Sequence, residues 1–116
     1  MRVSDVIALL DEFRPNGLSA SEKLRVVNTL EARLHALLLA PYGAEEFTPH
    51  ATSSEALLID PPGDELYLYY LMSQVDYLQG DATAYANDAL QFNARLLDAQ
   101  KRALRAEAPA GKRITV

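Results

Sequence analysis

The chain has no cysteine, no tryptophan and only five glycines among its 116 residues. Without cysteine it has neither a disulfide framework nor thiolate metal ligands. It also lacks a long hydrophobic run: a stretch such as 36–40 is far shorter than the roughly 20 apolar residues of a membrane-spanning helix. Acidic residues interrupt the N-terminal segment where a signal peptide has its apolar run, so we expect no targeting signal. Hydrophobic residues make up 49% and charged residues 23% of the chain, which favours a single ordered domain.

Basic residues are scarce over most of the chain. Residues 1–100 hold 6 basic and 15 acidic side chains, a balance of −9, whereas residues 101–116 hold 5 basic and 1 acidic, a balance of +4. An acidic body with a basic tail suggests that the tail meets an acidic surface of a protein or nucleic acid. The cations before residue 106 have an alternative interpretation, because positive charge in the last turn of a helix favours the helix dipole. The two cations at 112 and 113 lie beyond any expected helix, so the dipole does not account for them.

Motifs of known chemistry are absent from the sequence as well. It contains no HExxH, no phosphate-binding GxxxxGK[ST] or GxGxxG run, and no serine in a GxSxG setting. His35 is interpreted as a surface or packing residue, with Glu31 four residues before it on a face that we expect to be solvated. His50 stands alone in a long loop, where one imidazole cannot hold a metal. We therefore predict no catalytic residue, no metal site, no cofactor and no enzymatic activity.

Hydrophobic spacing and capping residues predict an all-α fold, a small four-helix domain. Ser4 is placed to cap a first helix that runs to about Phe13. The capping box Ser19-Ala20-Ser21-Glu22 opens a second helix that ends near Leu39, before Pro41. The third helix is expected at about 64–78, capped by Asp60 or Asp64. The fourth is expected at about 82–106.

Gly80 and Asp81 form the link between the last two predicted helices. Gly80 suits the left-handed end of a helix and Asp81 suits the cap of the next, so a link this short predicts an antiparallel hairpin. A long loop, 40–60, precedes the hairpin, and its segment 57–59 is either an extended strand or a plug onto the hairpin. Residues 1–106 are thus predicted to be one helical domain, and residues 107–116 an extended C-terminal arm.

Five of the six tyrosines lie in the predicted hairpin or its start. Stacking on nucleic-acid bases is one possible use of such a set. The surrounding helices are acidic and would repel phosphate, so a core and subunit-interface role is preferred. The predicted subunit interface comprises Tyr67, Tyr70, Tyr77, Tyr85 and Phe92.

The hairpin region also carries a series of short motifs in a fixed order, and so does the N-terminal segment. The latter has a short acidic helix, an Arg-Pro-Asn turn and a helix with Asn-x-Leu-Glu-x-Arg. In these motifs and their spacing, nearly all of residues 3–100 resembles the small helical head–tail connector (neck adaptor) proteins of long-tailed bacteriophages. The hairpin motifs are Leu57-Leu58, Pro62–Tyr67, Tyr70–Met72, Asp76-Tyr77, Gly80-Asp81, Tyr85–Asn87 and Phe92-Asn93.

The resemblance implies a structural virion protein in the phage neck, made in the bacterial host cytoplasm. Members of the head–tail connector family form a homo-oligomeric ring, usually of about twelve copies, beneath the portal protein. The ring extends the DNA channel and is a platform for the next neck or tail-completion protein. DNA passes through without sequence-specific binding, and no membrane is involved. From the charge asymmetry we add the hypothesis that the C-terminal arm docks to the portal through Arg105, Lys112, Arg113, Ile114 and Val116.

Two other functions fit parts of the sequence. One is a small helical regulatory or interaction domain that dimerises through the tyrosine hairpin. The other is a nucleic-acid binder, whose affinity would depend on salt. That binding would use Lys101, Arg102, Arg105, Lys112 and Arg113.

Overall fold

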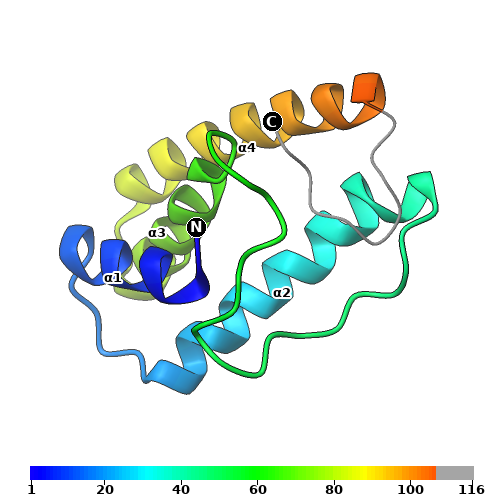
Figure 1. Cartoon of the computed structure of the whole chain (residues 1–116). Coiled ribbons are helices and arrows are strands. Elements are labelled where there is room, and N and C mark those ends of the chain that lie inside the picture. Colours follow the sequence, from blue (N-terminus) through cyan, green and yellow to red (C-terminus); the bar gives the residue numbers. More distant parts are fainter. Residues whose placement is uncertain (107–116) are drawn as a thin grey trace.

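Residues 1–106 are the part of the chain that the structure, a computed structural model, describes. They form four α-helices and one 3-10 turn, and no strand occurs among them, so the predicted all-α class is confirmed. The predicted arm, 107–116, lies outside the described residues. The elements are α1 (Val3–Phe13), α2 (Ala20–Leu38), η1 (Ala40–Tyr42), α3 (Glu65–Gln79) and α4 (Ala82–Ala106) (Figure 1).

Helix α1 begins earlier than predicted, and Ser4 is not its cap. Arg2 occupies the N-cap position, and its backbone N–H donates to the Asp5 carboxylate at 2.7 Å. The N–H of Ser4 instead donates to the carbonyl of Ser53, and Arg2 forms an isolated antiparallel bridge with Ala56. Local sequence patterns do not reveal this long-range pairing. The pairing holds Arg2 in the extended conformation and so determines that α1 begins at Val3.

Helix α2 begins at the predicted capping box. The Ser19 hydroxyl accepts from the Glu22 N–H at 3.1 Å, and the Glu22 carboxylate accepts from the Ser19 N–H at 3.1 Å. Two of the helix's free N-terminal donors are satisfied in this way. The helix then buries Val27, Leu30, Leu34 and Leu38 along one side.

Replacing Ser19 by alanine should lower the free energy of unfolding by about 1 kcal/mol, because the Glu22 N–H loses its acceptor. Urea unfolding followed by circular dichroism measures this loss. Thr83→Ala, at an exposed position in the first turn of α4, is the matched control and should change stability by less than about 0.5 kcal/mol. Equal losses in the two variants would contradict the role given to the cap.

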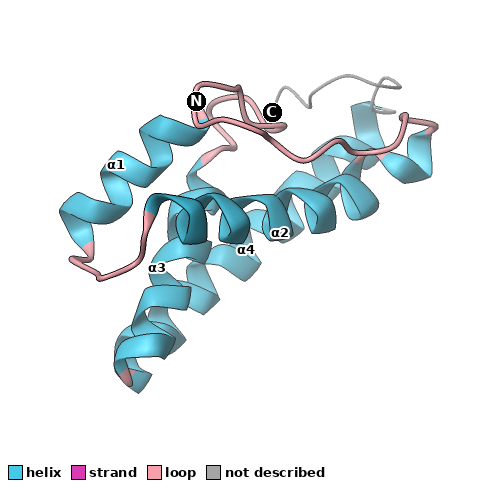
Figure 2. Ribbon diagram, turned by 90° about the horizontal axis from the view of Figure 1, so that it is seen from below, coloured by secondary structure: helices cyan, strands magenta, loops and turns pink. Residues whose placement is uncertain are grey.

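The predicted hairpin is formed by α3 and α4. Gly80 ends α3 in the left-handed conformation, with φ of 74°, and the Asp81 carboxylate accepts from the Ala84 N–H at 3.0 Å. The closed end of the hairpin projects away from α2, at the lower left of Figure 2. Asp64 holds the N-cap position of α3, but its carboxylate lies 3.6 Å from the N-terminal amino group of Met1 and makes no cap bond.

Helix α3 is the central element of the domain. It packs on α4 and α1 and touches α2, whereas α1 and α4 do not contact each other within residues 1–106. Its central position explains why α3 is apolar over most of its circumference, since Leu66, Tyr67, Leu71, Met72 and Val75 are all buried.

The connection between α2 and α3 runs back along α2 and across the domain (Figures 1 and 2). It contains no strand, but Leu57 and Ile59 are completely or almost completely buried in the core. Of the two alternatives for 57–59, the plug is therefore correct. Further upstream, Asn28 on α2 exchanges two hydrogen bonds with the backbone of His50, at 2.8 and 3.0 Å.

Candidate functional site

The five predicted interface residues fall into two groups. Tyr67 and Phe92 are buried in the core of the chain itself, and the Tyr70 and Phe92 rings meet edge to face with centroids 5.2 Å apart. Tyr77 and Tyr85 lie near the closed end of the hairpin, with side chains 71% and 38% exposed and ring centroids 5.9 Å apart. Tyr77 and Tyr85 are thus the most exposed members of the set, and Tyr70 is half-buried.

Leu78 extends this exposed aromatic pair. It is 65% exposed and stands next to Tyr77 just before the Gly80 turn. We call Tyr77, Leu78 and Tyr85 the hairpin tip. Apolar side chains this exposed at the end of a hairpin are a candidate contact surface.

A second exposed apolar surface lies along α4. Leu90, Leu97 and Leu104 are 66%, 53% and 66% exposed, and they follow one another at intervals of seven residues. At 100° per residue they line one face of the helix, nearly opposite the core face of Phe92 and Leu96. We call these three residues the leucine row. Sequence reasoning missed it because only the core stripe of this helix was followed.

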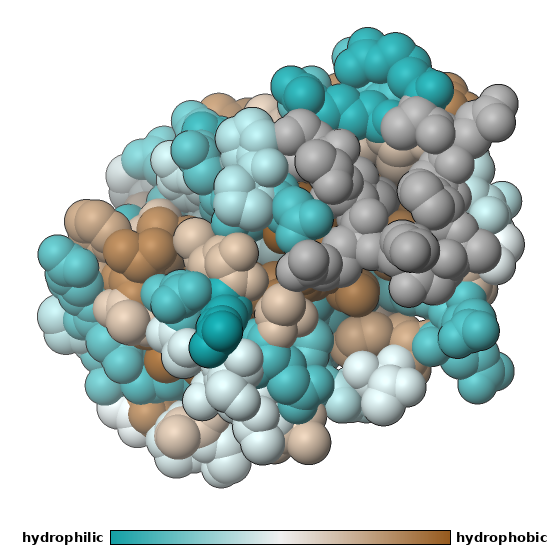
Figure 3. Space-filling model, in the orientation of Figure 1, coloured by the Kyte–Doolittle hydropathy of each residue, from teal (hydrophilic) through white to brown (hydrophobic). Residues whose placement is uncertain are grey.

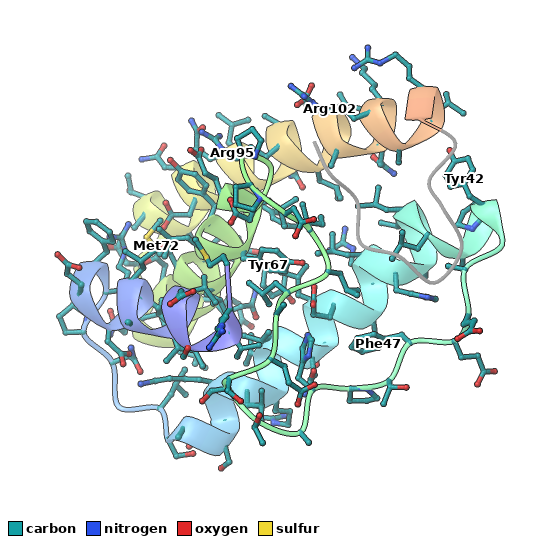
Figure 4. The ribbon with its side chains drawn as sticks, viewed as in Figure 1. Tyr42, Phe47, Tyr67, Met72, Arg95 and Arg102 are labelled. Carbon is teal, nitrogen blue, oxygen red and sulfur yellow. The ribbon has the colours of Figure 1, made fainter. Side chains whose placement is uncertain are left out.

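An apolar groove of about 430 Å³ lies between α1 and α3. Its walls include Leu9 and Phe13 from α1 and Leu68, Tyr69 and Met72 from α3. Figure 4 shows Met72 between these two helices, and Figure 3 shows hydrophobic atoms gathered over the same region. The sequence did not predict this groove, because it depends on how far apart two non-adjacent helices pack.

Glu31 is fully buried, so the expectation that it lies on a solvated face was wrong. Its carboxylate accepts from the Tyr67 hydroxyl at 2.5 Å and the Leu58 N–H at 2.9 Å, and lies 2.8 Å from His50 Nε2. The Tyr67 hydroxyl in turn accepts from the Ile59 N–H at 3.0 Å. We call this set the Glu31 cluster. Burial, together with the charge of Glu31, raises the pKa of Tyr67 well above its ordinary value.

The Glu31 cluster joins a His to a carboxylate and a hydroxyl, as some catalytic sites do. His50 and Tyr67 are both buried, however, and the polar hydrogens around Glu31 are taken up by its carboxylate. A nucleophile or general base must reach a substrate atom. The cluster therefore fastens the plug and the long connection to α2 and α3.

A second buried polar group joins the turn after α1 to the hairpin. Arg14 donates from Nε to Asp76 at 2.9 Å and from Nη2 to Asp88 at 3.0 Å, and both carboxylates are nearly inaccessible to solvent. Burial raises the pKa of Asp88 to about 6, with a further contribution from Asp76, while Arg14 acts in the opposite direction. Asp76 Oδ2 is buried without a hydrogen-bond partner among the described residues.

Of the predicted portal-docking residues, Arg105 lies exposed in the last turn of α4. The others (Lys112, Arg113, Ile114 and Val116) lie outside the described residues. Within residues 1–106, no three His, Asp or Glu side chains are grouped so that they could hold a metal ion. None of the helices in the same part combines the length and apolar character that crossing a membrane requires.

Comparison of the chain with protein-family models, with curated proteins and with solved structures found no match. The candidate binding surfaces of the described residues are the hairpin tip, the leucine row and the groove between α1 and α3.

Proposed function

We propose that this chain is a head–tail connector of a long-tailed bacteriophage. In this role it forms a homo-oligomeric ring beneath the portal protein, extends the DNA channel and carries the next neck or tail-completion protein. The observation that supports this most is the double-sided character of α4. Phe92, Leu96 and Ala103 are buried on one face, and the leucine row is exposed nearly opposite. An exposed apolar row in a small domain favours a neighbouring molecule that covers it.

The arrangement of the exposed surfaces favours a ring in particular. The hairpin tip lies at the closed end of the hairpin, the leucine row lies along α4, and the groove lies between α1 and α3. Apolar surfaces on different sides of one chain allow heterologous contacts, in which each copy uses one surface toward one neighbour and another toward the next. Such contacts close into rings when the rotation between copies permits it.

The charge distribution supports the proposed channel. Residues 1–100 carry a balance of −9, and a surface of that sign does not hold phosphate, since phosphate contacts require cations. DNA could therefore slide past the ring without sticking to it. The basic residues Arg105, Lys112 and Arg113 remain for docking to the portal.

The alternative is a small dimeric interaction domain. The leucine row favours it, because equally spaced leucines centred on Leu97 can pair with the same row of a second copy across a two-fold axis. A dimer of that kind keeps the mass of two copies and does not bind a portal protein.

Native mass spectrometry of the chain, alone and mixed with its candidate portal protein, distinguishes the two. We expect a ring-sized oligomer, or capture of about one copy for each portal subunit. A chain truncated after residue 106 is the matched variant: it should keep its helical circular dichroism and lose the portal. A stable dimer unaffected by the portal would refute the connector function. Normal portal binding by the truncated chain would refute the docking role of the arm.

A further inference from the structure

The groove between α1 and α3 is a mostly apolar surface that the protomer leaves open. Phe13, at one end of it, is 52% exposed, and the side chains of Leu9, Leu68 and Met72 form its walls. A helix whose exposed side chains project in a row can lay them into such a groove, which is a common mode of recognition between helical proteins.

The groove has an acidic margin. On α1, Asp5 and Glu12 stand four residues before and three residues after Leu9, so all three share one side of the helix. On α3, Glu65 lines the groove, with its carboxylate 3.2 Å from Arg95 Nε. The amino group of Met1 lies at the groove too, 3.6 Å from the Asp64 carboxylate, so among the described residues the unpaired acids of the margin are those on α1. Arg14 also lines the groove, but its guanidinium is held by Asp76 and Asp88. An occupant that suits this groove is therefore apolar in its centre and basic at its side.

The leucine row of α4 has these properties. At 1.5 Å per residue the row spans about 21 Å from Leu90 to Leu104, and the α3 wall of the groove spans about 10 Å from Glu65 to Met72, so the groove has room for part of the row. Lys101 is exposed four residues after Leu97 and three before Leu104, so it adds a cation to the same face.

We propose that the leucine row of one copy occupies the groove between α1 and α3 of the next copy, with Lys101 facing the acidic margin. This contact rests on the proposed ring and names the two surfaces that build it. Because α3 separates α1 from α4, a chain cannot fill its own groove with its own row. Each copy thus offers a row to one neighbour and a groove to the other, which is a heterologous contact.

The absence of cysteine makes the contact testable by cross-linking, because every introduced thiol is unique. Phe13→Cys and Leu97→Cys are made in separate chains, which are mixed at high concentration with the candidate portal protein and treated with a short bis-maleimide. We expect a dimeric adduct that contains one chain of each kind. Ala51→Cys, exposed on the long connection, replaces Phe13→Cys in the control mixture and should give no adduct.

Each outcome decides the proposal. A mixed Phe13→Cys and Leu97→Cys adduct supports it. Cross-linking of Leu97→Cys to itself overturns it, since the rows then face each other, and a mass fixed at two copies overturns the ring as well. A ring-sized species without the mixed adduct overturns this contact and leaves the connector function standing. A chain that stays monomeric, with or without the portal protein, overturns both.

Charge reversal gives a second measurement in chains that should fold normally, because both positions are exposed. Lys101→Glu or Glu12→Lys alone should weaken association about two- to fivefold, as expected for one exposed ion pair. The two together should restore it. Leu97→Asp should weaken association more than tenfold. Wild-type association in Leu97→Asp would exclude the leucine row as a contact.

Discussion

Replacing Glu31 by alanine should lower the free energy of unfolding by about 3–5 kcal/mol. The substitution leaves the Tyr67 hydroxyl, the Leu58 N–H and His50 Nε2 buried without their shared acceptor. A buried donor that loses its partner pays the full cost of leaving water, and here three lose it together. The expected loss therefore exceeds that of removing the methylene groups of the side chain alone.

Chemical unfolding in urea measures this effect, with Glu46→Ala as the matched control. Glu46 is an exposed glutamate in the connection between α2 and α3, and its replacement should change stability by less than about 0.5 kcal/mol. Glu31→Gln should fall between the two, because its amide keeps one acceptor oxygen but turns an NH₂ group toward the other donors. A loss below about 1 kcal/mol in Glu31→Ala would mean that water reaches these donors, and that the cluster does not fasten the connection.

Replacing Asp88 by asparagine should stabilise the protein at pH 7.5, by about 2 kcal/mol. Burial and the neighbouring Asp76 raise the Asp88 pKa from 3.8 to about 6. At pH 7.5 the Asp88 carboxylate is therefore ionised in the folded chain, and this ionisation lowers the free energy of unfolding. Each unit of such a shift corresponds to about 1.4 kcal/mol, and the pKa of about 6 already includes the opposing attraction to Arg14. Asparagine imitates the protonated acid: its oxygen can accept from Arg14, and its NH₂ can donate to Asp76.

The sign of the pH dependence follows from the raised pKa. Asp88 binds a proton more tightly in the folded chain, so the wild-type protein should gain stability as the pH falls from 7.5 to 5, and Asp88→Asn should not. The carboxylates of Asp11, Glu22 and Glu55 have lowered pKa values because of hydrogen bonds from Lys23, Ser19 and Thr52 respectively. The stability that these three contribute is lost only below about pH 4.5, outside this window.

Urea unfolding at pH 7.5 and at pH 5 tests this pair of expectations. Asp98→Asn is the control, because Asp98 is exposed on the same helix and pairs only with the exposed Arg102 among the contacts described. If Asp88→Asn were less stable than wild type at pH 7.5, the ion pair with Arg14 would outweigh the cost of burying two carboxylates.

Local features of the sequence were sufficient to predict most of the helices. The Ser19–Glu22 capping box and the Gly80-Asp81 link act within a few residues, so their outcome depends little on the rest of the chain. Ser4 is not the cap because Arg2, at the N-cap position, pairs with Ala56. These two residues lie more than fifty positions apart in the sequence. Local propensity could not anticipate that contact.

The candidate surfaces were less predictable than the helices. Tyrosines look alike in a sequence whether they fill a core, like Tyr67, or stand exposed, like Tyr77. Glu31 was placed on a solvated face because glutamate is rarely buried, and its three donors come from residues 19 to 36 positions away. The leucine row could have been found from its seven-residue spacing, which is visible without a structure.

The Glu31 cluster also separates two parts of the long connection that secondary structure does not distinguish. From His50 to Ile59 the chain is neither helix nor strand, yet it is fastened to α2 at its start and to Glu31 and Tyr67 at its end. Surface loops usually vary freely in length among relatives. Here the attachments at both ends set the spacing between His50 and Ile59, so lengthening or shortening this stretch would break one of them.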